Sequence, residues 1–227
     1  MARAVAETAQ VVAGHALATA FGHVSVRLGS DRLLITPPVS LAEATVERLV
    51  ALGIDEDPAS SGAPPEALLH QEIYRRRPDV TAVVRAQPPF AFAVAAVLDE
   101  IVPVHGQGAW LGPAVPVHPS ALLVRTRQRA VAATDSLADG CAVALRGNGA
   151  VTVGESADPV TALQWAGARM WLLEATCRIL LQAGGLGSPQ PLTGEEVDEW
   201  LAAAPPLIVR LWEHLRREHL AGLRARP

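Results

Sequence analysis

The sequence of 227 residues contains no lysine, so all 19 of its basic side chains are arginines. An enzyme that activates a carbonyl group as a Schiff base needs a side-chain amine, and only lysine supplies one. Schiff-base chemistry is therefore excluded. The arginines are scattered along the chain and the formal net charge is -4. Because no basic stripe could neutralise a run of phosphates, the expected partner is a small molecule and not a nucleic acid.

Cysteines are few and long apolar runs are missing. The two cysteines, Cys141 and Cys177, lack metal-ligand spacing, which favours buried thiols in a reducing compartment. No apolar stretch reaches the roughly 18 residues that a membrane span needs. The first residues, Met1 to Ala4, lack the charged and apolar order of a signal peptide. These absences predict a cytoplasmic protein with no membrane partner.

Apolar residues make up 50% of the chain, which suffices for one substantial core. A length of 227 residues is short for two ordinary domains, so residues 1–227 are expected to form a single domain.

Two apolar periodicities alternate along the chain, one helical and one with a period of two residues. The helical spacing predicts helices at residues 4–20, 40–50, 66–76, 90–98, 125–138, 158–181 and about 194–223. The two-residue period and short β-branched runs predict strands at residues 23–28, 32–36, 80–85, 101–105, 115–117, 141–146 and 150–153. Residues 55–65 are rich in Gly, Pro and Ser and predict a loop. The pattern indicates the α/β class.

Local signals refine some of these elements. Ser40 followed by Glu43 predicts a capping box at the start of the helix at 40–50. Asp158 is suited to cap the longest helix. Gly147-Asn148-Gly149 predicts a tight hairpin turn between two strands.

Four segments, residues 22–27, 65–80, 83–89 and 145–151, resemble the class II aldolase/adducin family in their order and spacing. The resemblance covers most of residues 5–185. It implies an α-β-α three-layer sandwich with a mixed, mostly antiparallel central sheet. It also implies a homo-oligomer, a tetramer or a dimer, with active sites between subunits.

The resemblance also implies a metal site that this sequence has changed. Enzymes of the family hold a divalent metal, typically zinc, with a His-x-His pair and a third histidine, and use an upstream carboxylate as acid/base. The matching positions are Arg85, Gln87, Asn148 and Glu66. A guanidinium has no lone pair to give, and amides are poor zinc ligands. The sequence therefore predicts neither a metal nor another cofactor.

The family's phosphate-binding positions have changed too. His23 stands in place of an asparagine, Val39 in place of a glycine, and Pro64-Pro65 in place of two serines. Prolines offer no N–H group, and Val39 adds bulk where an oxyanion would need close backbone approach. A substrate without phosphate is expected.

Three residues are the candidate catalytic groups. We expect Glu66 and His23 to move protons and Arg85 to hold a substrate carboxylate. For Glu66 the alternative is a carboxylate favoured by the start of a helix, and for Arg85 it is a structural ion pair with Glu66. His70, four residues after Glu66, could orient it, but packing is the more ordinary role of such a histidine.

The remaining candidates would contact substrate. We expect Gln87 and Asn148 to hydrogen-bond a developing enolate, although Asn148 is also a common residue in tight turns. His105, with His118, lies at a predicted strand end that the resemblance places near the cleft. Trp110 lies in a Gly-rich loop and could line the pocket.

Three functions remain open at this stage. The first is a metal-independent lyase acting on a non-phosphorylated, carboxylate-bearing carbonyl compound, with a role in specialised metabolism. Its reaction is C–C cleavage, decarboxylation, dehydration or a cyclising condensation, which share an enolate-like intermediate. The second is a non-catalytic small-molecule-binding or scaffold protein, as in the adducin branch. The third keeps a metal on other residues, drawn from Glu66, His70, His23 and His105.

Overall fold

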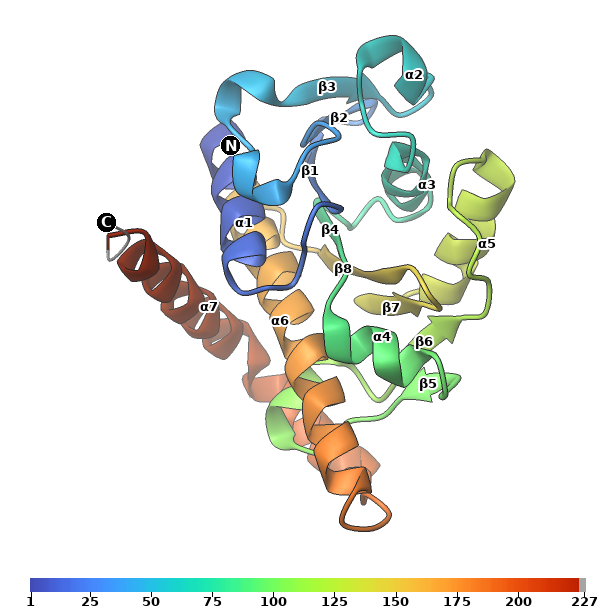
Figure 1. The fold of residues 1–227 in the computed structure, drawn as a ribbon, viewed down its shortest axis with the longest axis vertical. Coiled ribbons are helices and arrows are strands. Elements are labelled where there is room, and N and C mark those ends of the chain that lie inside the picture. The colour runs from blue at the N-terminus through green and yellow to red at the C-terminus, as the bar shows by residue number, and fades with distance from the viewer. Residues whose placement is uncertain (225–227) are drawn as a thin grey trace.

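A computed structural model describes residues 1–224 and shows one central sheet with helices on both faces (Figure 1). The sheet has eight strands in the order β3-β2-β1-β4-β8-β7-β6-β5. The strands are β1 (His23–Leu28), β2 (Arg32–Ile35), β3 (Val50–Gly53), β4 (Ala82–Ala86), β5 (Glu100–Ile101), β6 (Val115–His118), β7 (Ala142–Leu145) and β8 (Gly149–Gly154). Only β6 and β7 pair in parallel among the strand pairs of residues 1–224. The predicted mixed, mostly antiparallel sheet is confirmed.

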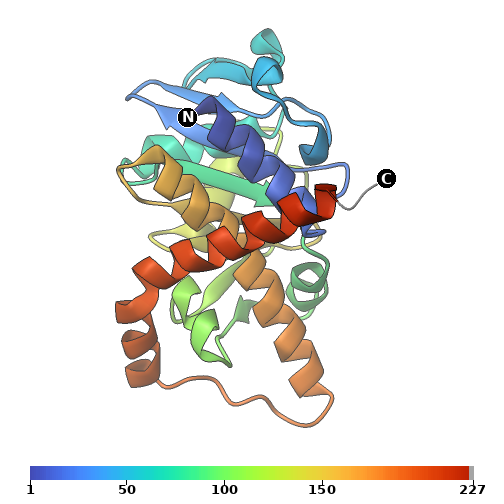
Figure 2. The same cartoon turned by 90° about the vertical axis from the view of Figure 1, so that its left-hand side faces the viewer.

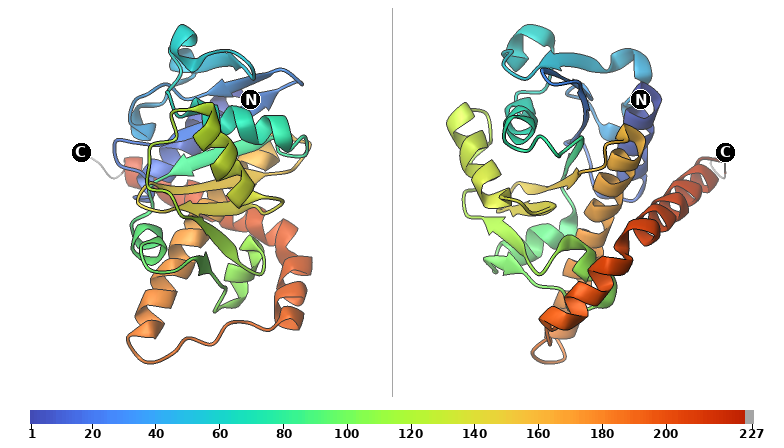
Figure 3. Two further views of the ribbon diagram at one scale, coloured as in Figure 1. Left: turned by 90° about the vertical axis from the view of Figure 1, so that its right-hand side faces the viewer. Right: turned by 180° about the vertical axis from the view of Figure 1, so that it is seen from behind.

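The helices lie in two layers, one on each face of the sheet (Figure 3). They are α1 (Ala2–Gly14), α2 (Pro58–Ser61), α3 (Ala67–Arg76), α4 (Pro89–Ala95), α5 (Arg127–Leu137), α6 (Pro159–Gly184) and α7 (Gly194–Arg224), with short 3-10 helices η1 (Leu41–Glu43), η2 (Val46–Arg48) and η3 (Gly106–Leu111). On β4, Val84 packs in the core cluster that includes residues of α1 and α6, whereas Val83 packs in the cluster of α3 and α5. Alternate strand residues thus bury opposite faces, which gives the three-layer sandwich.

The same alternation fixes where the polar residues of β1 and β4 lie. Arg85 shares the face of Val83, so it lies on the α3 and α5 side of the sheet. His23 is the cross-strand partner of Arg85, and Ser25 is the partner of Val83. Polar side chains are thereby grouped on one face, at the ends of two central strands.

Helix α7 crosses the face formed by α1 and α6 and bends along its length (Figure 2). Pro205 and Pro206 inside it explain the bend, because proline removes a helical hydrogen bond. The ring of Trp212 lies on Gly167 of α6, where an added Cβ would come within 2.4 Å of the ring. The predicted C-terminal helix is confirmed. No helix within residues 1–224 is long and apolar enough to cross a membrane.

The predicted helix at residues 40–50 is wrong. The segment forms η1 and η2, and Val50 already begins β3, an unpredicted strand that pairs with β2. Ser40 accepts a hydrogen bond from the N–H of Ala42 as a cap should, but only a 3-10 turn follows. Edge pairing with β2 outweighs a local helical preference that is weak at this length.

Other boundaries also differ from the prediction. The first helix ends at Gly14 and not at residue 20, because Ala16 adopts a left-handed φ of 57°. The strand predicted at 101–105 is limited to β5, since Pro103 cannot donate to a strand ladder. The predicted loop at 55–65 contains α2, which Asp57 caps.

Candidate active site

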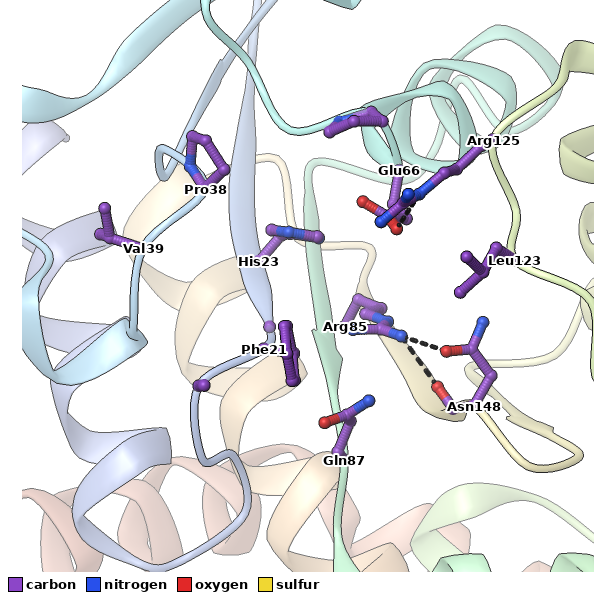
Figure 4. Close-up of a pocket in the computed structure, with 13 residues that line it drawn as sticks. Phe21, His23, Pro38, Val39, Glu66, Arg85, Gln87, Leu123, Arg125 and Asn148 are labelled. Carbon is purple, nitrogen blue, oxygen red and sulfur yellow. Dashed lines mark hydrogen bonds and ion pairs between the residues drawn. The ribbon is translucent and has the colours of Figure 1, made fainter.

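A cavity of about 390 Å³ opens beside the start of β1, the end of β4 and the turn between β7 and β8, next to the start of α3 (Figure 4). Its lining includes most of the predicted site residues, namely His23, Glu66, Arg85, Gln87 and Asn148. Apolar parts of the wall come from Phe21, Val39 and Leu123. The cavity therefore joins segments that are far apart in sequence.

Arg85 is 4% exposed, and its guanidinium has no carboxylate within ion-pair distance among residues 1–224. Its Nη2 donates to the backbone oxygen of Asn148 at 3.0 Å and to its Oδ1 at 2.5 Å. Burial lowers the pKa of the Arg85 guanidinium, while nearby Glu66 acts in the opposite direction. The result is a buried cation that neutral oxygens solvate only in part, which makes it a receptor for an anion.

Glu66 pairs with Arg125 and not with Arg85, so the alternative of a structural Arg85–Glu66 ion pair is wrong. The Nε of Arg125 donates to Oε1 of Glu66 at 2.8 Å. Glu66 holds the N-cap position of α3, but its side chain caps no backbone N–H. Since Arg125 is half-exposed, it is free to exchange Glu66 for a ligand carboxylate.

His23 is a neutral imidazole in this setting. Its side chain is buried beside Arg85, and burial followed by the Arg85 charge lowers its pKa to about 3. Its Nδ1 is sealed from solvent and has no hydrogen-bond partner within residues 1–224. The remaining ring nitrogen, Nε2, is the one available to a molecule in the cavity. A neutral ring can donate or accept a hydrogen bond there, but it is a weak base.

The Asn148 turn brings an amide to the cavity because its two flanking glycines have positive φ angles. Gly147 has φ 63° and Gly149 has φ 92°. A Cβ on Gly149 would lie 2.1 Å from the backbone oxygen of Ala86, so only glycine allows this approach to β4. Both oxygens of Asn148 accept hydrogen bonds from Arg85, so the NH2 group of its side chain is left to donate to a ligand.

The structure does not bring His105 and Trp110 to this cavity. The Nε2 of His105 lies 3.0 Å from Oγ1 of Thr176 on α6. The ring centroids of Trp110 and of Trp200 on α7 are 6.3 Å apart. Both residues therefore contact the helical layer on the opposite face. Arg125 and Phe21, which do line the cavity, were missed, because neither lies in a recognisable motif.

The residues at the family's metal-binding positions do not fit a divalent cation. Arg85 brings a permanent positive charge to the position, and the Oδ1 of Asn148 already accepts from it. Within residues 1–224, no group of three or more His, Cys, Asp or Glu side chains is placed to hold a metal. The alternative set is not gathered in one place, because His105 lies on the opposite face of the sheet, next to Thr176 of α6.

Protein purified without added metal should contain well below one zinc per chain, because a zinc site needs three or four proper ligands. Elemental analysis measures this content. The matched control is a triple variant with Arg85→His, Gln87→His and Asn148→His, which should gain about one zinc per chain. Stoichiometric zinc in the unaltered protein would contradict the prediction.

Folding stability should fall as the pH drops below 6.5, the ordinary pKa of histidine. The pKa values of His23 and His70 are lowered in the folded state, so the unfolded chain binds protons first. The stability that neutral His23 contributes is complete above pH 6.5 and is lost as the pH falls toward 3, and the contribution of His70 is lost in the same direction.

Urea unfolding between pH 4 and 8 measures this loss. His23→Gln should flatten the pH dependence, whereas His214→Gln, at an exposed histidine, should not. If the stabilities of the two variants depend on pH in the same way, His23 is not a buried neutral histidine in the folded protein.

Comparison with known proteins supports the fold. The model of the Class II Aldolase and Adducin N-terminal domain matches residues 3–181. A 3,4-dihydroxyphthalate decarboxylase of Arthrobacter keyseri is 36% identical over 174 residues, which are 68% of this chain and 69% of the relative. The enzyme of the same name from Terrabacter sp. (strain DBF63) is 32% identical over 89% of this chain and 88% of its own.

Solved structures agree with this assignment. The l-fuculose-1-phosphate aldolase from Thermus thermophilus superposes with a TM-score of 0.74 at 30% identity, over 83% of this chain and 96% of the aldolase. The family expected from the four sequence segments is therefore confirmed. The chain belongs to the class II aldolase/adducin family.

Proposed function

We propose that this protein is a lyase that decarboxylates a hydroxylated aromatic carboxylate without a metal ion. The observation that carries the proposal is the buried Arg85, a cation without a carboxylate partner among residues 1–224, in a cavity that also holds Glu66. The two relatives named 3,4-dihydroxyphthalate decarboxylase support the same reaction. They favour an enzyme over a scaffold.

The cavity suits an aromatic ring with more than one anionic group. Arg85 and Arg125 provide two cations, and Phe21 and Leu123 provide apolar walls. Val39 lines the cavity where the family resemblance places a phosphate-binding glycine, which disfavours phosphate. A dihydroxyphthalate-like compound, with two carboxylates on a hydroxylated ring, matches this arrangement.

The reaction requires one proton and one bond cleavage. Glu66, the only carboxylic acid among the cavity residues, takes the proton of the hydroxyl next to the departing carboxylate, which leaves a phenolate, and gives that proton to the ring carbon that bears the carboxylate. The adjacent phenolate oxygen becomes a carbonyl in this step. The C–C bond then breaks, CO2 leaves, and the bonding electron pair restores the ring and the phenolate. Arg85 and Arg125 hold the anions, while Gln87 and Asn148 donate hydrogen bonds.

The test is incubation of the purified protein with 3,4-dihydroxyphthalate and related hydroxylated benzoates. We expect one CO2 per substrate consumed and a product that has lost one carboxylate. Saturable binding of these compounds without any CO2 release would replace this proposal by the small-molecule-binding alternative.

We also propose that the chain is a homo-oligomer, as the family resemblance implies. Apolar side chains are exposed at the mouth of the cavity, with Phe21 63% exposed and Leu123 48% exposed. A partner subunit covering them would close the site. Light scattering should give a mass of two or four chains, and a stable monomer at micromolar concentration would contradict this.

A further inference from the structure

A buried row of polar side chains lies between β1 and α3, next to the cavity. The Nδ1 of His70 lies 2.7 Å from Oγ of Ser25, and that Oγ lies 2.8 Å from the hydroxyl of Tyr74. Ser25 and His70 are fully buried and Tyr74 is 1% exposed. His70 and Tyr74 are one turn apart on α3, so both face Ser25 on β1.

Two nitrogens at the cavity end of this row have no hydrogen-bond partner in the part of the chain that the structure describes. They are Nδ1 of His23 and Nε2 of His70, both buried. The two rings meet edge to face, with centroids 6.0 Å apart. Buried polar atoms are ordinarily hydrogen-bonded, and one water molecule between two such nitrogens would satisfy both.

The direction of the hydrogen bonds follows from Tyr74. Its other acceptor, the Thr81 oxygen, is 3.4 Å away and already accepts from the backbone N–H of Arg27 at 2.8 Å. The Arg27 guanidinium lies 4.8 Å from the Tyr74 ring centroid and makes the phenol a better donor. Burial raises the pKa of Tyr74, so its proton stays in place.

With Tyr74 as the donor to Ser25, the Ser25 hydroxyl donates to Nδ1 of His70. Because Nδ1 of His70 accepts this bond, the proton of the neutral ring is on Nε2. That nitrogen is the one next to His23.

We propose that His70 is a positioning residue that donates from Nε2, through one water molecule, to Nδ1 of His23. His23 is then held as the neutral tautomer that carries its proton on Nε2, the nitrogen available to the cavity. This inference rests on the proposed function for its consequence. When the C–C bond breaks, the electron pair returns to a ring oxygen, and a fixed N–H group stabilises the negative charge that develops there.

The tautomers are tested directly by ring 15N spectra of protein labelled with 15N-histidine, assigned with His23→Gln and His70→Gln. We expect both His23 and His70 to be neutral at pH 7 and protonated on Nε2. A proton on Nδ1 of either residue overturns the proposal. This measurement needs no substrate, so it stands apart from the fate of the proposed reaction.

Two variants then separate positioning from packing. The amide of Gln in His70→Gln lies close to the position of Nε2 and keeps a donor toward His23, whereas Asn in His70→Asn reaches only the Ser25 side. We expect His70→Asn to lower kcat by about 10- to 100-fold, with KM changed less than about twofold, and His70→Gln to recover most of kcat. Equal losses in both variants would indicate packing alone and overturn the proposal. If the unaltered protein releases no CO2 while the tautomers are as expected, the proposed function fails and the hydrogen-bond chain stands.

Discussion

Replacing Glu66 by glutamine should lower kcat by about 10²–10⁴-fold and leave KM nearly unchanged, because the proton donor is lost while both cations remain. The fold should tolerate the change. The ion pair with Arg125 involves a half-exposed guanidinium, and such pairs contribute about 0–1 kcal/mol to stability. Steady-state kinetics and a thermal melt measure the two effects.

Arg125→Gln is the matched control, because it breaks the same ion pair from the other side and keeps the carboxylate. It should raise KM through the loss of one cation and reduce kcat far less than Glu66→Gln does. If the two variants have the same kinetics, Glu66 acts only through its ion pair, and its role as proton donor is wrong.

Replacing Arg85 by methionine should weaken substrate binding by roughly 10²–10³-fold, since each hydrogen bond to a charged group contributes about 1.5–3 kcal/mol. The free energy of unfolding of the substrate-free protein should fall much less than the free energy of substrate binding. Arg85 has no carboxylate partner among residues 1–224, so its removal strands no opposite charge. A structural ion pair would instead cost about 3–5 kcal/mol when broken.

Thermal melts with and without substrate separate these effects in one experiment. Without substrate, Arg85→Met should have a melting temperature close to that of the unaltered protein. With substrate, its melting temperature should not rise as that of the unaltered protein does. Arg85→Lys keeps the charge but not the two-pronged geometry, so its affinity should be intermediate. A large fall in the melting temperature of Arg85→Met without ligand would show that Arg85 is structural.

The fold could be predicted largely because the sequence motifs coincide with the centre of the sheet. Strands β1, β4 and β8 carry the residues of the family resemblance, and their pairing places His23 opposite Arg85. Segments at the sheet edge were predicted less well. β3 forms because β2 offers an unpaired edge, and no local pattern in residues 50–53 announces this partner.

The sequence predicted which residues form the site better than it predicted which of them contact one another. Arg85, Glu66 and Asn148 do line one cavity, but Arg85 donates to Asn148 and Glu66 binds Arg125. Arg125 lies before α5 in a segment without a motif, so only the tertiary fold reveals it. The sequence favoured a packing role for His70. Its hydrogen bond to Ser25 joins two elements that are far apart in the chain, so no local pattern predicts it.

Release of CO2 from 3,4-dihydroxyphthalate by chelator-treated protein, with metal content measured on the same sample, tests the metal-independent decarboxylase most directly. Stoichiometric CO2 should appear at a rate that neither the chelator nor added zinc changes, and Glu66→Gln should abolish nearly all of it. A rate that falls with chelation and returns with a divalent metal would contradict the proposed role of Arg85, Gln87 and Asn148 in place of a metal site.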